Sequence, residues 1–211
     1  MFVRVFLRLL LLFCSGHLAF SQNIQMKGNN GGVFSLGARS VISAFNDGKW
    51  SDVGAGAGGQ FMIQFSNRVN TAWFMDYITG TVGNKANRQD VHIGWSVMYY
   101  LISNPPENKN RLTPYILAGH CFDYTKMSDN SNHNNFADKK SSAVQAGLGT
   151  HVHLTQRFDI MIQSQYMIHL GNDLTMNIVN NQVVFVHNPG VNLEGHILTS
   201  LVLNFKIADL W

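Results

Sequence analysis

Charged and histidine side chains alternate with apolar residues along much of this sequence, and these are the groups that could carry chemistry. The residues that share this alternating position are Arg39, Asp76, Asp90, His92, His151, His153, Asp159, Glu194, His196 and Lys206. Successive side chains of a β-strand point to opposite faces, so we expect this set to lie on one interior face. Buried charges are tolerated only when they are paired. The pattern therefore predicts a structural network of paired polar groups.

Metal binding is an alternative for part of this set. His151 and His153 are two residues apart, so both would point the same way from one strand. His196 or Asp159 on neighbouring strands could then complete a zinc ligand set. The nine histidines are dispersed, however, and no His or Cys spacing matches a zinc motif. We therefore expect polar fillers at these positions, with no metal and no cofactor.

The segments that must position these side chains are eight stretches of alternating apolar and polar residues. They cover residues 32–45, 52–65, 69–79, 89–102, 112–125, 142–154, 158–170 and 193–207. Each is longer than the roughly five or six residues of an ordinary strand. Long alternating strands separated by turn residues are typical of transmembrane β-barrels. The sequence thus predicts an all-β protein that forms an eight-stranded antiparallel up-and-down transmembrane β-barrel.

The stretch 89–102 shows the alternation most clearly, with Val91, Ile93 and Trp95 on one face and Asp90 and His92 on the other. A soluble antiparallel sandwich with one wet face would alternate in the same way. Aromatic residues toward the strand ends favour the membrane, because such residues form girdles at the lipid interface. These aromatics are Trp50, Trp73, Tyr77, Tyr99, Tyr100, Tyr115, Phe122, Tyr124 and Tyr166.

The first residues of the chain predict export. Arg4 and Arg8 begin a segment that continues with a short apolar run and a small-residue cleavage pattern before residue 22. This arrangement is typical of a secretory signal peptide over residues 1–21, and the apolar run is too short to span a membrane. Residues 22–211 would then form a single barrel domain.

The charge balance and the cysteine count exclude two classes of protein. Without the two arginines of the signal segment, 13 basic residues stand against 12 acidic ones, which gives no case for binding nucleic acid. Cys121 would be the only cysteine of the exported chain, so a disulfide framework is excluded. A lone thiol of this kind is more often a small buried residue than a nucleophile.

The connections between the stretches predict an orientation and a candidate contact surface. The gaps 128–141 and 171–192 are the longest, and long loops of such barrels face outward while short turns and both termini face the periplasm. The second gap carries apolar residues that could mark a partner site, namely Met176, Ile178, Val184 and Phe185. The alternative is a hairpin that extends the two flanking strands, with these residues facing each other.

Four segments resemble the small eight-stranded outer-membrane barrels of the OmpA/OmpX type, and more narrowly the barrel-only proteins common in Bacteroidota. They are residues 114–119, 147–160, 193–197 and 203–207. The best of them joins a Gly147-x-Gly149 strand to a short turn with Arg157, after which Phe158 restarts the next strand. The resemblance covers nearly all of residues 22–211. Its motifs are architectural, so it implies a fold and an outer-membrane location and no particular activity.

The same resemblance implies partners. Membrane lipid and lipopolysaccharide would surround the barrel, and barrel-assembly machinery would insert it. Phe205, Ile207 and Trp211 resemble the terminal aromatic signal that this machinery recognises. Other outer-membrane proteins are further potential partners. The tight turn usual in the family is missing at residues 103–111.

These observations predict a non-enzymatic outer-membrane protein with a structural, adhesive or interaction role. One alternative is an accessory barrel subunit of a larger complex for secretion, gliding, nutrient uptake or barrel assembly. Another is a lipid A-modifying barrel enzyme, because deacylases of this kind carry a His-x-Ser-Asn pattern with a serine nucleophile. The nearest match here, His169 to Asn172, has Gly171 where that serine should be.

Overall fold

Ten β-strands and no helix occur in the part of the chain that the computed structural model describes, which is residues 31–47, 50–104, 111–171, 173–180, 182–188 and 195–211. The strands are β1 (Val33–Asp47), β2 (Trp50–Gln64), β3 (Val69–Val82), β4 (Ala86–Tyr100), β5 (Leu112–Asp129), β6 (Phe136–His153), β7 (Phe158–Leu170), β8 (Asp173–Val179), β9 (Gln182–Asn188) and β10 (Gly195–Asp209). The segment predicted to be a signal peptide, the side chain of Trp50 and the whole of Glu194 lie outside the described part.

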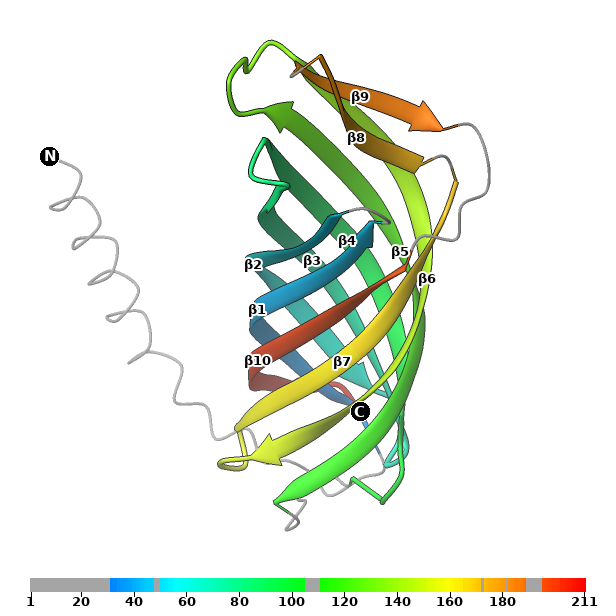
Figure 1. Cartoon of the computed structure of the whole chain (residues 1–211). Helices are drawn as coiled ribbons and strands as arrows, with labels where there is room; N and C mark the ends of the chain where they lie inside the picture. The colour runs from blue at the N-terminus through cyan, green and yellow to red at the C-terminus, as the bar shows by residue number, and fades with distance from the viewer. Residues whose placement is uncertain (1–30, 48–49, 105–110, 172, 181, 189–194) are drawn as a thin grey trace, which may run out of the picture.

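Eight of these strands close into an antiparallel barrel in the order β1-β10-β7-β6-β5-β4-β3-β2 (Figure 1). Closure comes from pairing of the first and last strands, with Val41 opposite Ser200. Every predicted strand is present, and the predicted boundaries agree to within a few residues except in β5 and β6. Closure leaves no unpaired sheet edge in the wall, which a β-structure inside lipid requires.

The barrel is inverted relative to a soluble protein. Along β4, Ile93 and Trp95 are exposed on the outside, whereas Asp90 and His92 are at most 1% exposed on the inside. Outward apolar residues recur on the other strands of the wall. Water would be a poor solvent for this exterior, and lipid a good one, so the arrangement is that of a transmembrane barrel. Among the described residues, no helix is long and apolar enough to cross a membrane.

Two aromatic residues that we predicted to lie in the interfacial girdles lie inside the barrel instead. Tyr100 and Tyr115 are each 1% exposed and pack edge to face in the lumen, with their ring centroids 5.9 Å apart. Their hydroxyls are accommodated there because each has a hydrogen-bond partner. Asn70 donates to the Tyr100 hydroxyl, and the Tyr115 hydroxyl donates to Gln163. Trp73 does face outward, as predicted, and stacks on Phe61.

The gap at residues 128–141, predicted to be a long loop, is mostly strand. β5 and β6 continue past the other strands as a tall hairpin, with Lys126 opposite Asp138 and Ser128 opposite Phe136 (Figure 1). Opposite charges and an aromatic contact across the pair stabilise this extension, since the Lys126 ammonium lies 4.8 Å from the Phe136 ring centroid. The prediction of a long loop was therefore wrong, because it was based on polar composition alone.

The gap at residues 171–192 holds a separate two-stranded sheet, β8–β9, that caps one side of the barrel mouth (Figure 1). The alternative of a hairpin that simply extends the two flanking strands is therefore wrong, because β8 and β9 pair in a sheet of their own. The chain leaves β7 through Gly171, whose φ of 137° is a backbone conformation that favours glycine. The hairpin is held by an apolar cluster in which Leu174, Met176 and Val183 pack against residues of β3, β4 and β5.

Candidate functional site in the barrel lumen

A buried ion pair organises the middle of the lumen. Arg39 on β1 binds Asp76 on β3 through two hydrogen bonds, from Nε to Oδ1 at 2.8 Å and from Nη2 to Oδ2 at 3.0 Å. Gly58 lies between them on β2, opposite Arg39 on one side and opposite Asp76 on the other. A Cβ atom at Gly58 would meet the Asp76 carboxylate, so the glycine leaves the space through which the pair forms. The guanidinium also lies over the Phe74 ring, 4.6 Å from its centroid.

Hydrogen bonds continue from this pair across the lumen. Arg39 Nη1 donates to Gln60, and Gln60 Nε2 donates to Asn204 Oδ1 at 2.9 Å. Asn204 then donates to Asp159 Oδ1 at 2.9 Å, and the same oxygen lies 2.7 Å from His151 Nδ1. These side chains come from β1, β2, β6, β7 and β10, so the network ties opposite walls of the barrel together.

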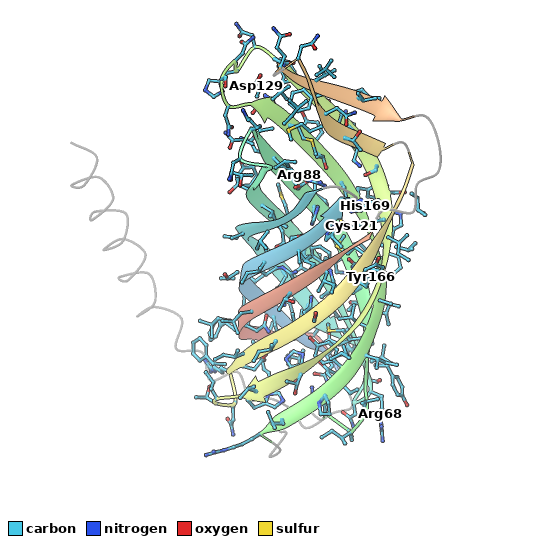
Figure 2. The ribbon with its side chains drawn as sticks, in the orientation of Figure 1. Arg68, Arg88, Cys121, Asp129, Tyr166 and His169 are labelled. Carbon is cyan, nitrogen blue, oxygen red and sulfur yellow. The ribbon has the colours of Figure 1, made fainter. Side chains whose placement is uncertain are left out.

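A second group of polar residues gathers around Asp123 in the half of the lumen nearer the tall hairpin. Cys121 Sγ donates to Asp123 Oδ1 at 2.9 Å, and His169 Nδ1 lies 2.9 Å from Oδ2, although these two atoms are not aligned as a hydrogen bond. His169 Nε2 and His196 Nδ1 share a hydrogen bond of 2.9 Å. His92 completes the group, with Nε2 3.7 Å from Asp123. Figure 2 shows Cys121 and His169 close together.

His92 is the least satisfied member of this group. Its side chain is fully buried, and neither ring nitrogen has a hydrogen-bond partner. Leaving a buried polar group unsatisfied costs about 1–3 kcal/mol. The ring is held mainly by stacking on His196, with centroids 5.6 Å apart. Within the described ranges, no three His, Cys, Asp or Glu side chains are arranged to hold a metal ion.

The structure distributes the predicted polar set over several groups. Arg39 joins Asp76, His151 joins Asp159, and His92 joins His196. Asp90 pairs instead with Arg88 at 3.0 Å and accepts a hydrogen bond from Thr125 at 2.6 Å (Figure 2 labels Arg88). Lys206 is buried near the turn end of the lumen.

Of the residues weighed as metal ligands, His151, His153 and Asp159 lie close together and His196 lies apart, and His151 is already bonded to Asp159. His153 stacks on His151, with ring centroids 6.0 Å apart, and bonds to Thr113 at 3.0 Å. His196 lies in the other group, against His169 and His92. His169, the histidine of the deacylase-like segment, points into the lumen toward Asp123.

The sequence-based prediction missed several members of the lumen groups. These are Gln60, Arg88, Asp123, His169 and Asn204. Asp123, His169 and Asn204 all stand at the alternate positions of their strands whose side chains point into the lumen. This alternation is the signal that could have found them. The missing information was which strands face each other across the lumen, because strand order in a closed barrel brings together residues that are far apart in sequence.

The remaining predicted sites lie at the two ends of the molecule. Of the candidate partner residues, Ile178 and Val184 are exposed and Phe185 is partly buried. Met176 is 2% exposed, so its predicted exposure was wrong: it packs under the hairpin. Trp211 is exposed at the other end and stacks on a phenylalanine of the β2–β3 turn, with centroids 6.3 Å apart.

A small cavity lies at the turn end of the lumen. Its volume is about 10 Å³, and its lining includes Tyr100, His151 and Lys206. A cavity of this size holds about one water molecule. The side chains of an eight-stranded barrel are just able to fill its interior. Two apolar clusters, one that contains Met98 and one that contains Ile78, lie in the lumen beside the polar network.

Comparisons with known proteins support the fold and give no family. No protein-family model matches the chain, and no curated protein matches it. Among solved structures, Neisserial surface protein A is similar with a TM-score of 0.53 and 13% identity, covering 82% of this chain and 97% of that one. The outer membrane protein OprG from Pseudomonas aeruginosa gives 0.52 and 14%, covering 87% and 100%. A major outer membrane protein from Thermus thermophilus gives 0.52 and 6%, covering 82% and 99%. At these identities the likeness concerns the fold alone.

Proposed function

We propose that this chain is a non-enzymatic outer-membrane protein that acts by presenting a protein-binding surface at its extracellular end. The lumen network supports this proposal, because the Arg39–Asp76 pair and its hydrogen-bonded partners cross an eight-stranded barrel that is only wide enough for side chains to fill. The similarity to outer-membrane barrels of three bacteria supports the membrane assignment.

The proposed orientation places the short turns and both termini in the periplasm. Gly32 and Leu210 lie side by side at the turn end, where the Leu210 amide donates to the Gly32 carbonyl at 2.8 Å. The opposite end carries the tall β5–β6 hairpin and the β8–β9 cap (Figure 1). Outer-membrane barrels have short periplasmic turns and longer extracellular loops, which favours this orientation.

The observation that carries the proposal is the two-faced packing of the β8–β9 hairpin. One face is buried against the barrel mouth through Leu174 and Met176. The other face exposes Val179 and Val184, which are 52% and 39% exposed, beside the exposed Asn177. A hairpin that packs on the barrel through one face and exposes apolar side chains on the other is suited to a partner surface, because burying those side chains stabilises a complex.

A pull-down from the membrane fraction in mild detergent tests this proposal. The tag is inserted after Asn132, in the exposed β5–β6 turn, so that the C-terminus stays free. We expect the wild-type chain to capture a partner in stoichiometric amount and the Val179→Ser/Val184→Ser variant to lose it. Asn177→Ser, opposite Val184 on the same face, is the matched control and should keep the partner.

The identity of the captured protein separates the two forms of the proposal. A large outer-membrane partner identifies an accessory subunit of a complex, and a partner from outside the cell identifies an adhesive protein. Equal capture by the wild type and the double serine variant would reject the hairpin as the contact surface.

A further inference from the structure

The outer edge of β9 pairs with no other strand in the part of the chain that the structure describes. β8 and β9 form a sheet of their own, in which β9 has β8 as its neighbour. Of the two strands, β8 lies nearer the barrel wall, against β6. β9 lies on the side of the hairpin away from the barrel mouth (Figure 1). An edge strand presents a row of backbone N–H and C=O groups to which another strand can bind.

A hydrogen bond from Asn135 shows which backbone groups of β9 point outward. The Asn135 side chain donates from Nδ2 to the Val183 carbonyl oxygen at 2.9 Å, so this carbonyl is directed away from β8. Every second residue of an antiparallel strand directs its N–H and C=O to the same side, so Phe185 and His187 direct theirs outward as well. Among the described residues, none bonds to these outward groups of Phe185 and His187. The open part of the edge is therefore at these two residues.

β9 carries none of the features that protect edge strands from pairing. Natural edges are protected by charged side chains, by proline or by a β-bulge. The sequence from Gln182 to Asn188 contains no Lys, Arg, Asp, Glu or Pro, and its register with β8 has no shift. Its centre, residues 183–186, consists of valine and phenylalanine, which favour strands. β9 is therefore suited to bind a further strand.

The strand is complementary to a second copy of itself. An antiparallel pair centred on Val186 places Phe185 of each copy opposite His187 of the other. These are the residues whose outward backbone groups are open, so each Phe185–His187 pair can exchange both of its hydrogen bonds. Each pair also brings two aromatic rings together, which stabilises a cross-strand contact. No like charges meet, because the strand has no acidic or basic residue other than His187. The register also leaves Val183 to Asn135.

We propose that β9 forms the contact of a symmetric dimer, in which two copies of this chain pair their β9 strands antiparallel about Val186. The pairing joins two hairpins into one four-stranded sheet, and a sheet of more than two strands is more stable than an isolated hairpin. The second copy adds at the edge, so the hairpin face with Val179 and Val184 stays uncovered. The dimer therefore goes beyond the function proposed above, and it places two such faces side by side.

Disulfide cross-linking of the full exported chain, purified at high dilution in mild detergent, tests this contact. Opposite Cα atoms of an antiparallel pair lie about 4.5–5.5 Å apart, and a disulfide spans about 4.4–6.8 Å. We therefore expect Val186→Cys to form a covalent dimer on mild oxidation with copper–phenanthroline, seen as a doubled mass that dithiothreitol reverses. The native Cys121 is fully buried and should contribute little.

Val184→Cys is the matched control for this cross-link. It lies on the same face of β9 and is more exposed than Val186, so random collisions would favour it. In the proposed register, the two copies of residue 184 are four positions apart along the strands, or about 13 Å. A disulfide cannot span that distance, so Val184→Cys should form at least fivefold less covalent dimer than Val186→Cys.

A second pair of variants tests the backbone hydrogen bonds. In the Val186→Cys chain, His187→Pro removes an N–H that points away from β8 and should suppress the covalent dimer at least fivefold. His187→Ala keeps the N–H and should reduce the dimer much less. Resistance of residues 173–188 to proteinase K checks that the proline variant keeps its hairpin.

Several results would overturn the dimer. Equal yields from Val186→Cys and Val184→Cys would reject the register, and no cross-link at Val186→Cys would reject the contact. A cross-link in membranes to a different protein, with none between purified copies, would assign the edge to that protein. Adding Val179→Ser/Val184→Ser to Val186→Cys should leave the cross-link unchanged. The dimer and the proposed hairpin face can therefore fail independently, and a cross-link lost with these serines would move the contact to the face.

Discussion

Arg39 and Asp76 form a two-bond ion pair across the intervening strand β2, over Gly58, and neither side chain is accessible to solvent. The relationship explains why a glycine occupies this inward position: any larger residue would fill the space in which the two side chains meet. It also ties three consecutive strands together at the level where the lumen network begins.

The first prediction concerns the loss of one member of this pair. Asp76→Leu should strongly destabilise the barrel, by about 3–5 kcal/mol, because it leaves the Arg39 charge buried without its partner. The double variant Arg39→Met/Asp76→Leu should recover most of the loss, since it removes both charges. Urea unfolding of the protein in lipid vesicles measures both. A double variant no more stable than Asp76→Leu would show that the pair is not the source of the effect.

Adjacent glycines give the second prediction. Gly58→Ala should destabilise the protein by about 1–3 kcal/mol, because the added methyl group overpacks the lumen against Asp76. Gly59→Ala should change the stability little, because that methyl group would point outward, with the Gly37 carbonyl oxygen at 3.8 Å as its nearest neighbour. The same urea titration compares the two variants. Equal effects on stability would contradict the assignment of inward and outward faces on β2.

The third prediction contrasts two buried histidines. His92→Leu should leave the stability unchanged or raise it, because the native ring has no hydrogen-bond partner to lose. His151→Leu should lower the stability by about 1–3 kcal/mol, because Asp159 loses the hydrogen bond of 2.7 Å that His151 provides. The urea midpoints of unfolding in the same vesicles compare the stability of each variant with that of the wild type. A large loss on His92→Leu would indicate that this ring has a partner or a role that its contacts do not reveal.

A fourth prediction addresses the hairpin. Met176→Ala should loosen β8–β9 from the barrel mouth, because Met176 is buried in the apolar cluster beneath it. Limited proteolysis with proteinase K should then cut within residues 173–188 several times faster than in the wild type. Asn177→Ala, its exposed neighbour, should be cut at the wild-type rate. An unchanged rate for Met176→Ala would mean that the hairpin is held by other contacts.

Trp211, which we predicted to be part of an assembly signal, gives a fifth prediction. Trp211→Ser should reduce the amount of folded barrel in cells, while the purified variant refolds in detergent as well as the wild type. Trp211 is exposed and contacts mainly Phe65, so its removal costs the folded state little. Leu210→Ser is the matched control. A refolding defect in detergent would assign Trp211 a role in stability instead of assembly.

The barrel wall was predictable from sequence because its signal is local. On β4 each residue alternates between lipid and lumen, so Trp95 and His92 could be assigned to opposite faces from their parity alone. The β8–β9 cap was harder, because Met176 is buried by contacts with β3, β4 and β5 that no local pattern encodes. Tyr100 was placed in the girdle because of its residue type, although it stands at an inward position of the β4 alternation, as His92 does.

The groups within the lumen depended on tertiary information as well. Asp123 and His169 are far apart in sequence and come together because β5 and β7 flank β6 in the closed barrel. The alternation along each strand identified the inward residues. Which of their side chains contact each other depends on the strand order and the register. Arg88 shows the same limit, because its inward position next to Asp90 on β4 could be read from the sequence while the partnership of Asp90 with Thr125 could not.

Surface labelling of single cysteines in intact cells tests the central claim, that the hairpin is displayed outside the cell on a membrane-spanning barrel. Cys121 is fully buried, so it should contribute little background. A membrane-impermeant maleimide should label Val184→Cys in intact cells and Gln156→Cys, in the exposed β6–β7 turn, only after the outer membrane is permeabilised. Labelling of Gln156→Cys in intact cells, with Val184→Cys protected, would contradict the proposed orientation and with it the extracellular role of the hairpin.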